Sequence, residues 1–243
     1  MGKAVGMSFN PDKCEVLRIT NKRSPIHTTY SLHGQHLALT TNSKYLGVTI
    51  SSDLSWNAHI NTITKNANQT LGFLRRNVSK CPPDIKTKCY ESFVRPILEY
   101  SSSAWAPHTQ RNIQSLEAVQ RRAARFVTSD YRRTSSVTDM LQSLQWDTLH
   151  QRRMRSQVVM CYKIVASIVD IPAADYLTIR SGRNIDSLRG HSHKFIQPRA
   201  RVLAFQYSFF PYTIKLWNDL PPSLVAAPSV EAFRHGLASI QLP

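Results

Sequence analysis

The stretch SKYLGVTISSDLSWNAHI, residues 43–60, separates two structural styles in this chain. Its first half is rich in β-branched and aromatic residues, which predicts a strand over 45–50. Gly47 inside that strand predicts a bulge or the close approach of another backbone. Ser51, Ser52 and Asp53 predict a turn that leads into a helix. Strand patterns precede this stretch and helical patterns follow it, so we place the boundary between a sheet and a helical region here.

The residues before this boundary predict a small antiparallel sheet. A turn at residues 10–12, a strand over 14–19, a hairpin around Gly34 and the strand over 45–50 give about four strands. The first three residues offer no element on which such a sheet could rest. Because a half-built sheet exposes an edge, we expect the N-terminus to be a cut through a larger domain.

The residues after the boundary predict helices at 57–78, 84–100, 111–128, 136–144 and 148–169, with a last helix capped by Ser229. Pro96 should kink the second helix. The buried stripe of the first helix should be Ile60, Ile63, Ala67, Leu71 and Leu74. That of the second should be Ile85, Cys89, Phe93, Ile97 and Tyr100. That of the third should be Ile113, Leu116, Val119, Ala123 and Phe126.

These patterns predict an α+β fold that is mostly α-helical. We divide it into a partial sheet (1–56), a helical bundle (57–170) and a C-terminal region (171–243). The C-terminal region begins with a basic loop over 180–201, which is either a nucleic-acid-binding arm or disordered. His191 and His193 in that loop could chelate a metal, but a solvated basic loop is the better interpretation. An aromatic stretch over 205–222 follows.

The charge of the chain is unusual for its 243 residues: 31 Lys and Arg against 15 Asp and Glu give a formal net charge of +16. Such an excess favours a polyanionic partner, nucleic acid before a membrane surface, over a basic surface that is merely well solvated. The four cysteines are scattered and show no zinc-binding or disulfide spacing, which indicates a reducing compartment. No signal peptide or membrane span is present in the sequence. We therefore expect an intracellular protein, in the cytoplasm or the nucleus, with no membrane partner.

The acidic residues argue against a self-contained enzyme. The five glutamates are isolated and no two acidic residues are adjacent. A two-metal phosphoryl-transfer site needs at least two carboxylates held close together. Glycine-rich phosphate-binding and nucleophile motifs are also absent. We therefore predict no catalytic residue, metal ligand or cofactor in this chain, although an enzyme whose residues converge from distant positions stays as a third interpretation.

The basic residues are the better guide to binding. Lys65, Arg75 and Arg76 lie off the apolar stripe of the first helix, and arginines cluster at 121–125, 132–133 and 152–155. As a set they favour contacts with phosphates. The four tryptophans lie near helix boundaries and are better explained as core anchors than as platforms for stacking bases.

Several sequence blocks resemble the reverse transcriptases of non-LTR (LINE-type, jockey-like) retrotransposons. In chain order they are Phe9–Cys14, Lys44–Val48, Asp53–Trp56, His59–Ile60, Leu71–Asn77, Arg95–Tyr100, Trp105, Leu116–Arg125, Phe209–Pro211 and Leu216–Pro221. The first resembles the block that follows the catalytic Y-x-D-D hairpin of that family. The later blocks are similar to its thumb, post-thumb and C-terminal regions.

The resemblance implies a fragment of an RNA-directed DNA polymerase. The catalytic aspartates of the family would lie before Met1, so the chain alone should be inactive, and Mg²⁺ is expected only for the complete enzyme. The implied partners are RNA and DNA as a primer–template duplex, bound without sequence preference, and the N-terminal half of the polymerase. The alternative is a domesticated nucleic-acid-binding or scaffold protein with no polymerase role.

The resemblance also assigns roles to residues near the boundary. Lys13 falls in the block implied to help pyrophosphate leave, and Lys44, Tyr45 and Gly47 fall in the implied primer grip. With the basic residues of the helices, the candidate nucleic-acid-binding set is Lys13, Lys44, Tyr45, Gly47, Lys65, Arg75, Arg76, Arg121, Arg122 and Arg125.

Overall fold

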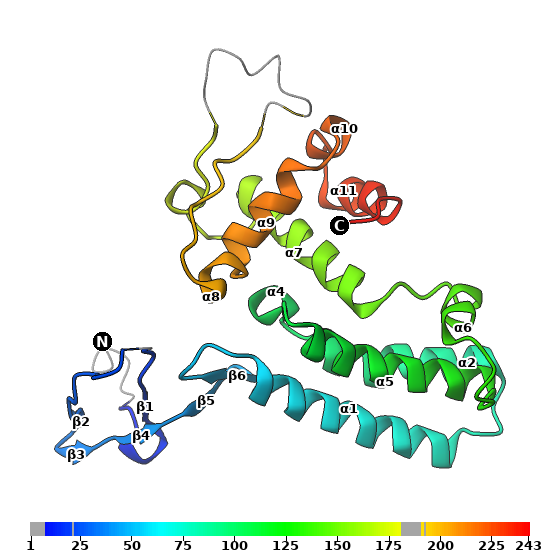
Figure 1. Ribbon diagram of the computed structural model, residues 1–243, viewed down its shortest axis with the longest axis horizontal. Helices are drawn as coiled ribbons and strands as arrows, with labels where there is room; N and C mark the ends of the chain where they lie inside the picture. Colours follow the sequence, from blue (N-terminus) through cyan, green and yellow to red (C-terminus); the bar gives the residue numbers. More distant parts are fainter. Residues whose placement is uncertain (1–7, 21, 181–190, 192) are drawn as a thin grey trace. The chain divides into compact units, whose positions relative to one another are not determined.

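The computed structural model describes residues 8–20, 22–180, 191 and 193–243 (Figure 1). The chain divides into two compact units, Met1–Thr62 and Ile63–Pro243. Short strands lie in the first unit, helices make up most of the second, and helix α1 (Asn57–Asn77) begins in the first and ends in the second. The predicted α+β class with mostly helix is confirmed. The division at residues 56 and 170 stays a prediction.

The strands of the first unit form three separate two-stranded ladders instead of one sheet of four strands. A single 3₁₀ turn, η2, covers Pro11–Lys13. The pairs are β1 (Glu15–Leu17) with β4 (Ala38–Thr40) in parallel, β2 (Ser31–Leu32) with β3 (Gln35–His36) antiparallel, and β5 (Asn42–Tyr45) with β6 (Val48–Ser51) antiparallel. A tight turn joins the two strands of each hairpin. The strands are only two to four residues long, so their edges offer little length for pairing with a third strand.

Gly47 forms a turn and not the bulge that its position in an apolar run suggested. Leu46 (φ 46°) and Gly47 (φ 85°) are the two central residues between β5 and β6, and Tyr45 pairs directly with Val48. Two consecutive residues with positive φ make the type I′ turn that matches the twist of a hairpin. Leucine is unusual at the first of these positions, so the stretch looked like one continuous strand. The hairpin predicted around Gly34 is confirmed, with His33 and Gly34 in the same geometry.

His59 connects the last hairpin to the start of α1 in the first unit. Its side chain is buried, and Nδ1 accepts a hydrogen bond from the backbone N–H of Thr49 at 3.3 Å. Burial lowers the pKa of His59 below its ordinary value of about 6.5. The folded first unit therefore favours the neutral imidazole.

We expect the stability contributed by His59 to be present above pH ~6.5 and to fall as the pH drops below that value, because the unfolded chain then binds the proton first. An NMR titration should show the His59 ring titrating below pH ~6.5, with the Thr49 amide signal shifting in parallel. In His59→Gln the Thr49 shift should disappear. A His59 ring that titrates at or above pH ~6.5 would contradict the burial of this side chain.

The helices of the second unit continue from α1. Their bounds are α2 (Pro83–Cys89), the π-helical turn η3 (Tyr90–Val94), α3 (Arg95–Glu99), α4 (Ser102–Trp105), α5 (Gln110–Thr128), α6 (Val137–Ser143), α7 (Leu149–Val165), the 3₁₀ turn η4 (Ala173–Asp175), α8 (Leu203–Gln206), α9 (Phe209–Asn218), α10 (Pro222–Val225) and α11 (Val230–Ala238). The stripes predicted for α1 and α5 are confirmed as buried. Helix α7 lies centrally, packed against α3, α4 and α5 and also against α9 and α11 (Figure 1).

The second predicted helix runs over 83–99 but contains a wide turn, and its predicted stripe is wrong. Ile85, Phe93 and Tyr100 are exposed, whereas the buried side chains are Lys86, Tyr90, Val94 and Leu98. Proline at position 96 has no N–H to donate, and a π-helical turn immediately precedes it. These four buried residues are spaced four apart, and this spacing keeps them on the inner side of the helix through the wide turn.

The described part of the predicted basic loop is fixed by contacts with α9. His191 is buried, with Nε2 3.0 Å from the backbone oxygen of Trp217, so the interpretation of a solvated position is wrong. Asn218 accepts from the backbone N–H of Phe195 and donates to its carbonyl, both at 2.9 Å. Positions 181–190 and 192, which include Arg183 and Arg189, lie outside the described residues.

Candidate nucleic-acid interface

Helix α1 presents only positive charges to solvent. The sequence has no Asp or Glu between Asp53 and Asp84. Lys65, Arg75 and Arg76 are exposed. Helical spacing puts Lys65 and Arg76 opposite the buried stripe and Arg75 at its edge. Exposed cations on a helix that carries no acidic residue are suited to the phosphate backbone of a nucleic acid.

Helix α5 continues this basic surface. Arg121 and Arg122 are exposed, and the one acidic residue of the helix, Glu117, is buried. Arg122 Nη1 donates to Asn68 Oδ1 of α1 at 3.0 Å, so Arg122 lies beside α1. We call this surface the basic face and define it by Lys65, Arg75, Arg76, Arg121 and Arg122.

An exposed tyrosine borders the basic face. Tyr131, in the loop after α5, lies under the guanidinium of Arg75, whose central carbon is 5.3 Å from the ring centroid. About half of the tyrosine is exposed. Tyr131 was not among the predicted site residues, although an aromatic residue between Asp130 and two arginines was a signal for such a contact.

Other predicted basic positions are occupied by internal contacts. The guanidinium of Arg125 donates to the carbonyls of Asp130, Arg132 and Ser135, so this side chain holds the loop after α5. Arg132 pairs with Asp130 at 2.8 Å and holds the pKa of that carboxyl well below its ordinary range. Ion pairs also join Arg152 to Glu99 and Arg155 to Asp147. The arginine clusters at 132–133 and 152–155 therefore contribute less free charge than their sequence suggests.

The candidates in the first unit lie at exposed positions. Lys13 ends η2, and Lys44, Tyr45 and Gly47 lie at or beside the turn of the β5–β6 hairpin. About two thirds of Tyr45 is exposed, so its ring contributes little to a core. Their assignment to a primer grip stays a prediction.

The described residues include no group of three or more His, Cys, Asp or Glu side chains that could hold a metal ion. Over the same residues, no helix combines the length and apolar character needed to cross a membrane.

Comparison with known proteins supports one relationship. The chain is 28% identical over 129 residues to a probable RNA-directed DNA polymerase from transposon BS of Drosophila melanogaster. That similarity supports a relationship to reverse transcriptases. The match covers 50% of this chain but only 14% of the transposon polymerase, so the chain corresponds to a small part of that protein's length. No family model and no solved structure matches the chain.

Proposed function

We propose that this chain is a fragment of the RNA-directed DNA polymerase of a non-LTR (LINE-type, jockey-like) retrotransposon, and that its helical unit binds a primer–template duplex through the phosphates. The similarity to the transposon polymerase supports the descent. In this proposal the catalytic aspartates belong to a further polypeptide segment, so the chain binds nucleic acid but does not polymerise.

The observation that carries the binding role is the basic face. Five exposed cations from two adjoining helices lie on a surface to which neither helix contributes an exposed carboxylate. Spaced cations of this kind are suited to contacts with phosphates. Contacts of this kind read the shape and charge of a duplex and carry no sequence preference.

We expect the chain to bind an RNA–DNA duplex with an affinity that falls steeply as the salt concentration rises. Changing Arg75, Arg76, Arg121 and Arg122 together to Gln should weaken binding at low salt at least tenfold and flatten the dependence of log K on log salt, because fewer counterions are released. Fluorescence anisotropy over a series of NaCl concentrations measures both quantities.

The matched control removes the same charge from the C-terminal part of the second unit, with Arg199, Arg201, Lys215 and Arg234 changed to Gln. It should keep most of the affinity. Equal losses in the two variants would show that binding follows net charge and not the basic face. Absent or salt-independent binding would instead favour the domesticated scaffold interpretation. Primer extension by the chain alone should yield no product, and a metal-dependent product would overturn the assignment as an inactive fragment.

A further inference from the structure

Arg153 is a buried cation without a partner. It lies on the inner side of α7 with 1% of its surface exposed, and its Nε, Nη1 and Nη2 atoms have no hydrogen-bond partner. Buried polar atoms in proteins are almost always hydrogen-bonded, and a buried charge is costly without compensation. Burial lowers the pKa of Arg153 to about 10, against the opposing influence of Glu117 and Glu99. Neither glutamate forms an ion pair with it.

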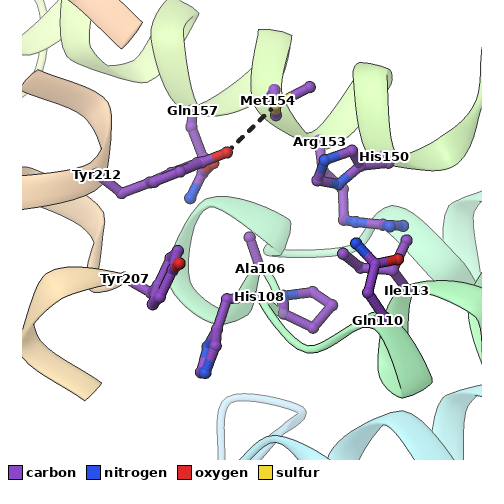
Figure 2. A pocket seen from close by; sticks show the side chains of 11 residues that line it. Ala106, His108, Gln110, Ile113, His150, Arg153, Met154, Gln157, Tyr207 and Tyr212 are labelled. Atoms are coloured by element: carbon purple, nitrogen blue, oxygen red, sulfur yellow. Dashed lines mark hydrogen bonds between the residues drawn. The ribbon is translucent and has the colours of Figure 1, made fainter. Parts of the chain in front are cut away.

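Arg153 lines a cavity of about 120 Å³ whose other walls come from α5, α7, α9, the segment after α4 and the residue after α8. Figure 2 shows Arg153 extending from α7 beside His150 toward the start of α5, where Gln110 and Ile113 lie. Gln157, also on α7, is buried and its Oε1 has no partner. Among the described residues that line the cavity, none is acidic.

The cavity wall offers further polar groups at its solvent side. The rings of His108 and Tyr207 stack with centroids 4.3 Å apart, and His108 and Gln110 are exposed. The hydroxyl of Tyr212 instead donates to the sulfur of Met154 at 3.4 Å (Figure 2). A ligand could therefore enter past His108, and it would reach the guanidinium, whose nitrogens are covered in this structure, when a neighbouring side chain of the wall moves aside.

We propose that this cavity binds a phosphate group through Arg153. A guanidinium presents a fork of N–H donors that matches an oxyanion in two-point contact. Water could satisfy those donors but would add no negative charge to that of Glu117 and Glu99, neither of which forms an ion pair with Arg153. The polar side chains of His108, Gln110, Tyr207 and His150 line the same cavity and offer further hydrogen-bonding groups to a bound phosphate. The cavity shares no residue with the basic face, so this inference does not depend on the proposed duplex binding.

Calorimetric titration with inorganic phosphate at constant ionic strength tests the proposal. Arg153→Met should weaken phosphate binding at least tenfold, since it removes the only cation in the wall while keeping an apolar stem of similar length. His108→Ala, at an exposed position, should weaken it by a smaller factor. Arg111→Met is the matched control: it removes an exposed charge one residue from Gln110 and should leave the affinity unchanged. Circular dichroism reports whether each variant keeps its helices, and the His108→Ala result decides the matter if Arg153→Met unfolds.

Further ligands identify the source of the phosphate. A short oligonucleotide with a 5′-phosphate that binds better than its 5′-hydroxyl counterpart, with the preference lost in Arg153→Met, would assign the cavity to a nucleic-acid end. Phosphate binding without such a preference would assign it to free phosphate. Two results would overturn the proposal: equal phosphate affinity in the wild type and Arg153→Met, or acetate binding as tightly as phosphate.

Discussion

Replacing Trp217 with alanine should lower the free energy of unfolding by about 3–5 kcal/mol, among the largest losses expected from a single core truncation in this chain. Trp217 is 1% exposed in α9, and its ring packs against those of Phe195 and Phe233, with centroids 5.9 and 6.1 Å away. Its Nε1 also donates to the carbonyl of His193 at 3.0 Å. Alanine would leave a large cavity and would remove the donor to this carbonyl in the same place. A domain is stable by only about 5–15 kcal/mol, so urea unfolding should detect the change readily.

Two further variants separate the effects at Trp217. Trp217→Phe keeps an aromatic ring but removes the indole donor, so its loss should be clearly smaller than that of alanine. Phe205→Ala removes an aromatic side chain that is 45% exposed in the neighbouring α8, and should cost under about 1 kcal/mol. Similar losses for Trp217→Ala and Phe205→Ala would contradict the packing described for the C-terminal core.

The helices that were predicted well are α1 and α5, whose apolar stripes are regular even though α5 also buries Asn112, Glu117 and Gln120. In α1 and α5 the apolar residues recur at three- and four-residue steps, and the structure buries each of them. The region 83–99 failed because Lys86 occupies a buried position there. Its Nζ donates to Ser129 at 2.8 Å and lies 5.5 Å from the centroid of Phe126. The spacing of apolar residues does not reveal a charged residue that buries its aliphatic chain and hydrogen-bonds to a residue distant in the sequence.

In the candidate sites, too, exposed charges were predictable from the sequence and buried charges were not. The exposed cations of the basic face were predictable because α1 has no acidic residue to neutralise them. The ion pair of Arg152 was not predictable from the sequence, because its partner Glu99 lies 53 residues away. Arg153 was grouped with its neighbours as a surface cluster. One signal was present: Leu149, Arg153, Gln157 and Cys161 recur every four residues, and the first and last are apolar. That pattern places the two polar residues on the buried side.

Replacing Glu117 with alanine should cost about 3 kcal/mol, the second large effect that we expect. Glu117 is buried in α5, and its Oε1 accepts the backbone N–H of His150 in the first turn of α7 at 2.8 Å. Nearby, Gln120 donates to the carbonyl of Asp147 at 2.9 Å, so both side chains attach α5 to the start of α7. Alanine would leave a helix N–H unpaired and would remove a negative charge that favours the protonated form of Arg153.

Glu117→Gln separates the two contributions, because it keeps an oxygen acceptor for His150 and removes only the charge. Its loss of stability should be smaller than that of alanine and should shrink further in the double variant with Arg153→Met, since the buried cation that Glu117 opposes is then gone. Additive losses in the double variant would show that the two charges act independently. The same substitution has an opposite effect on the cavity: with one fewer negative charge near Arg153, Glu117→Gln should bind phosphate more tightly than the wild type while being less stable. A general loosening of the fold would weaken both, so the opposite signs distinguish an electrostatic role for Glu117 from a purely structural one.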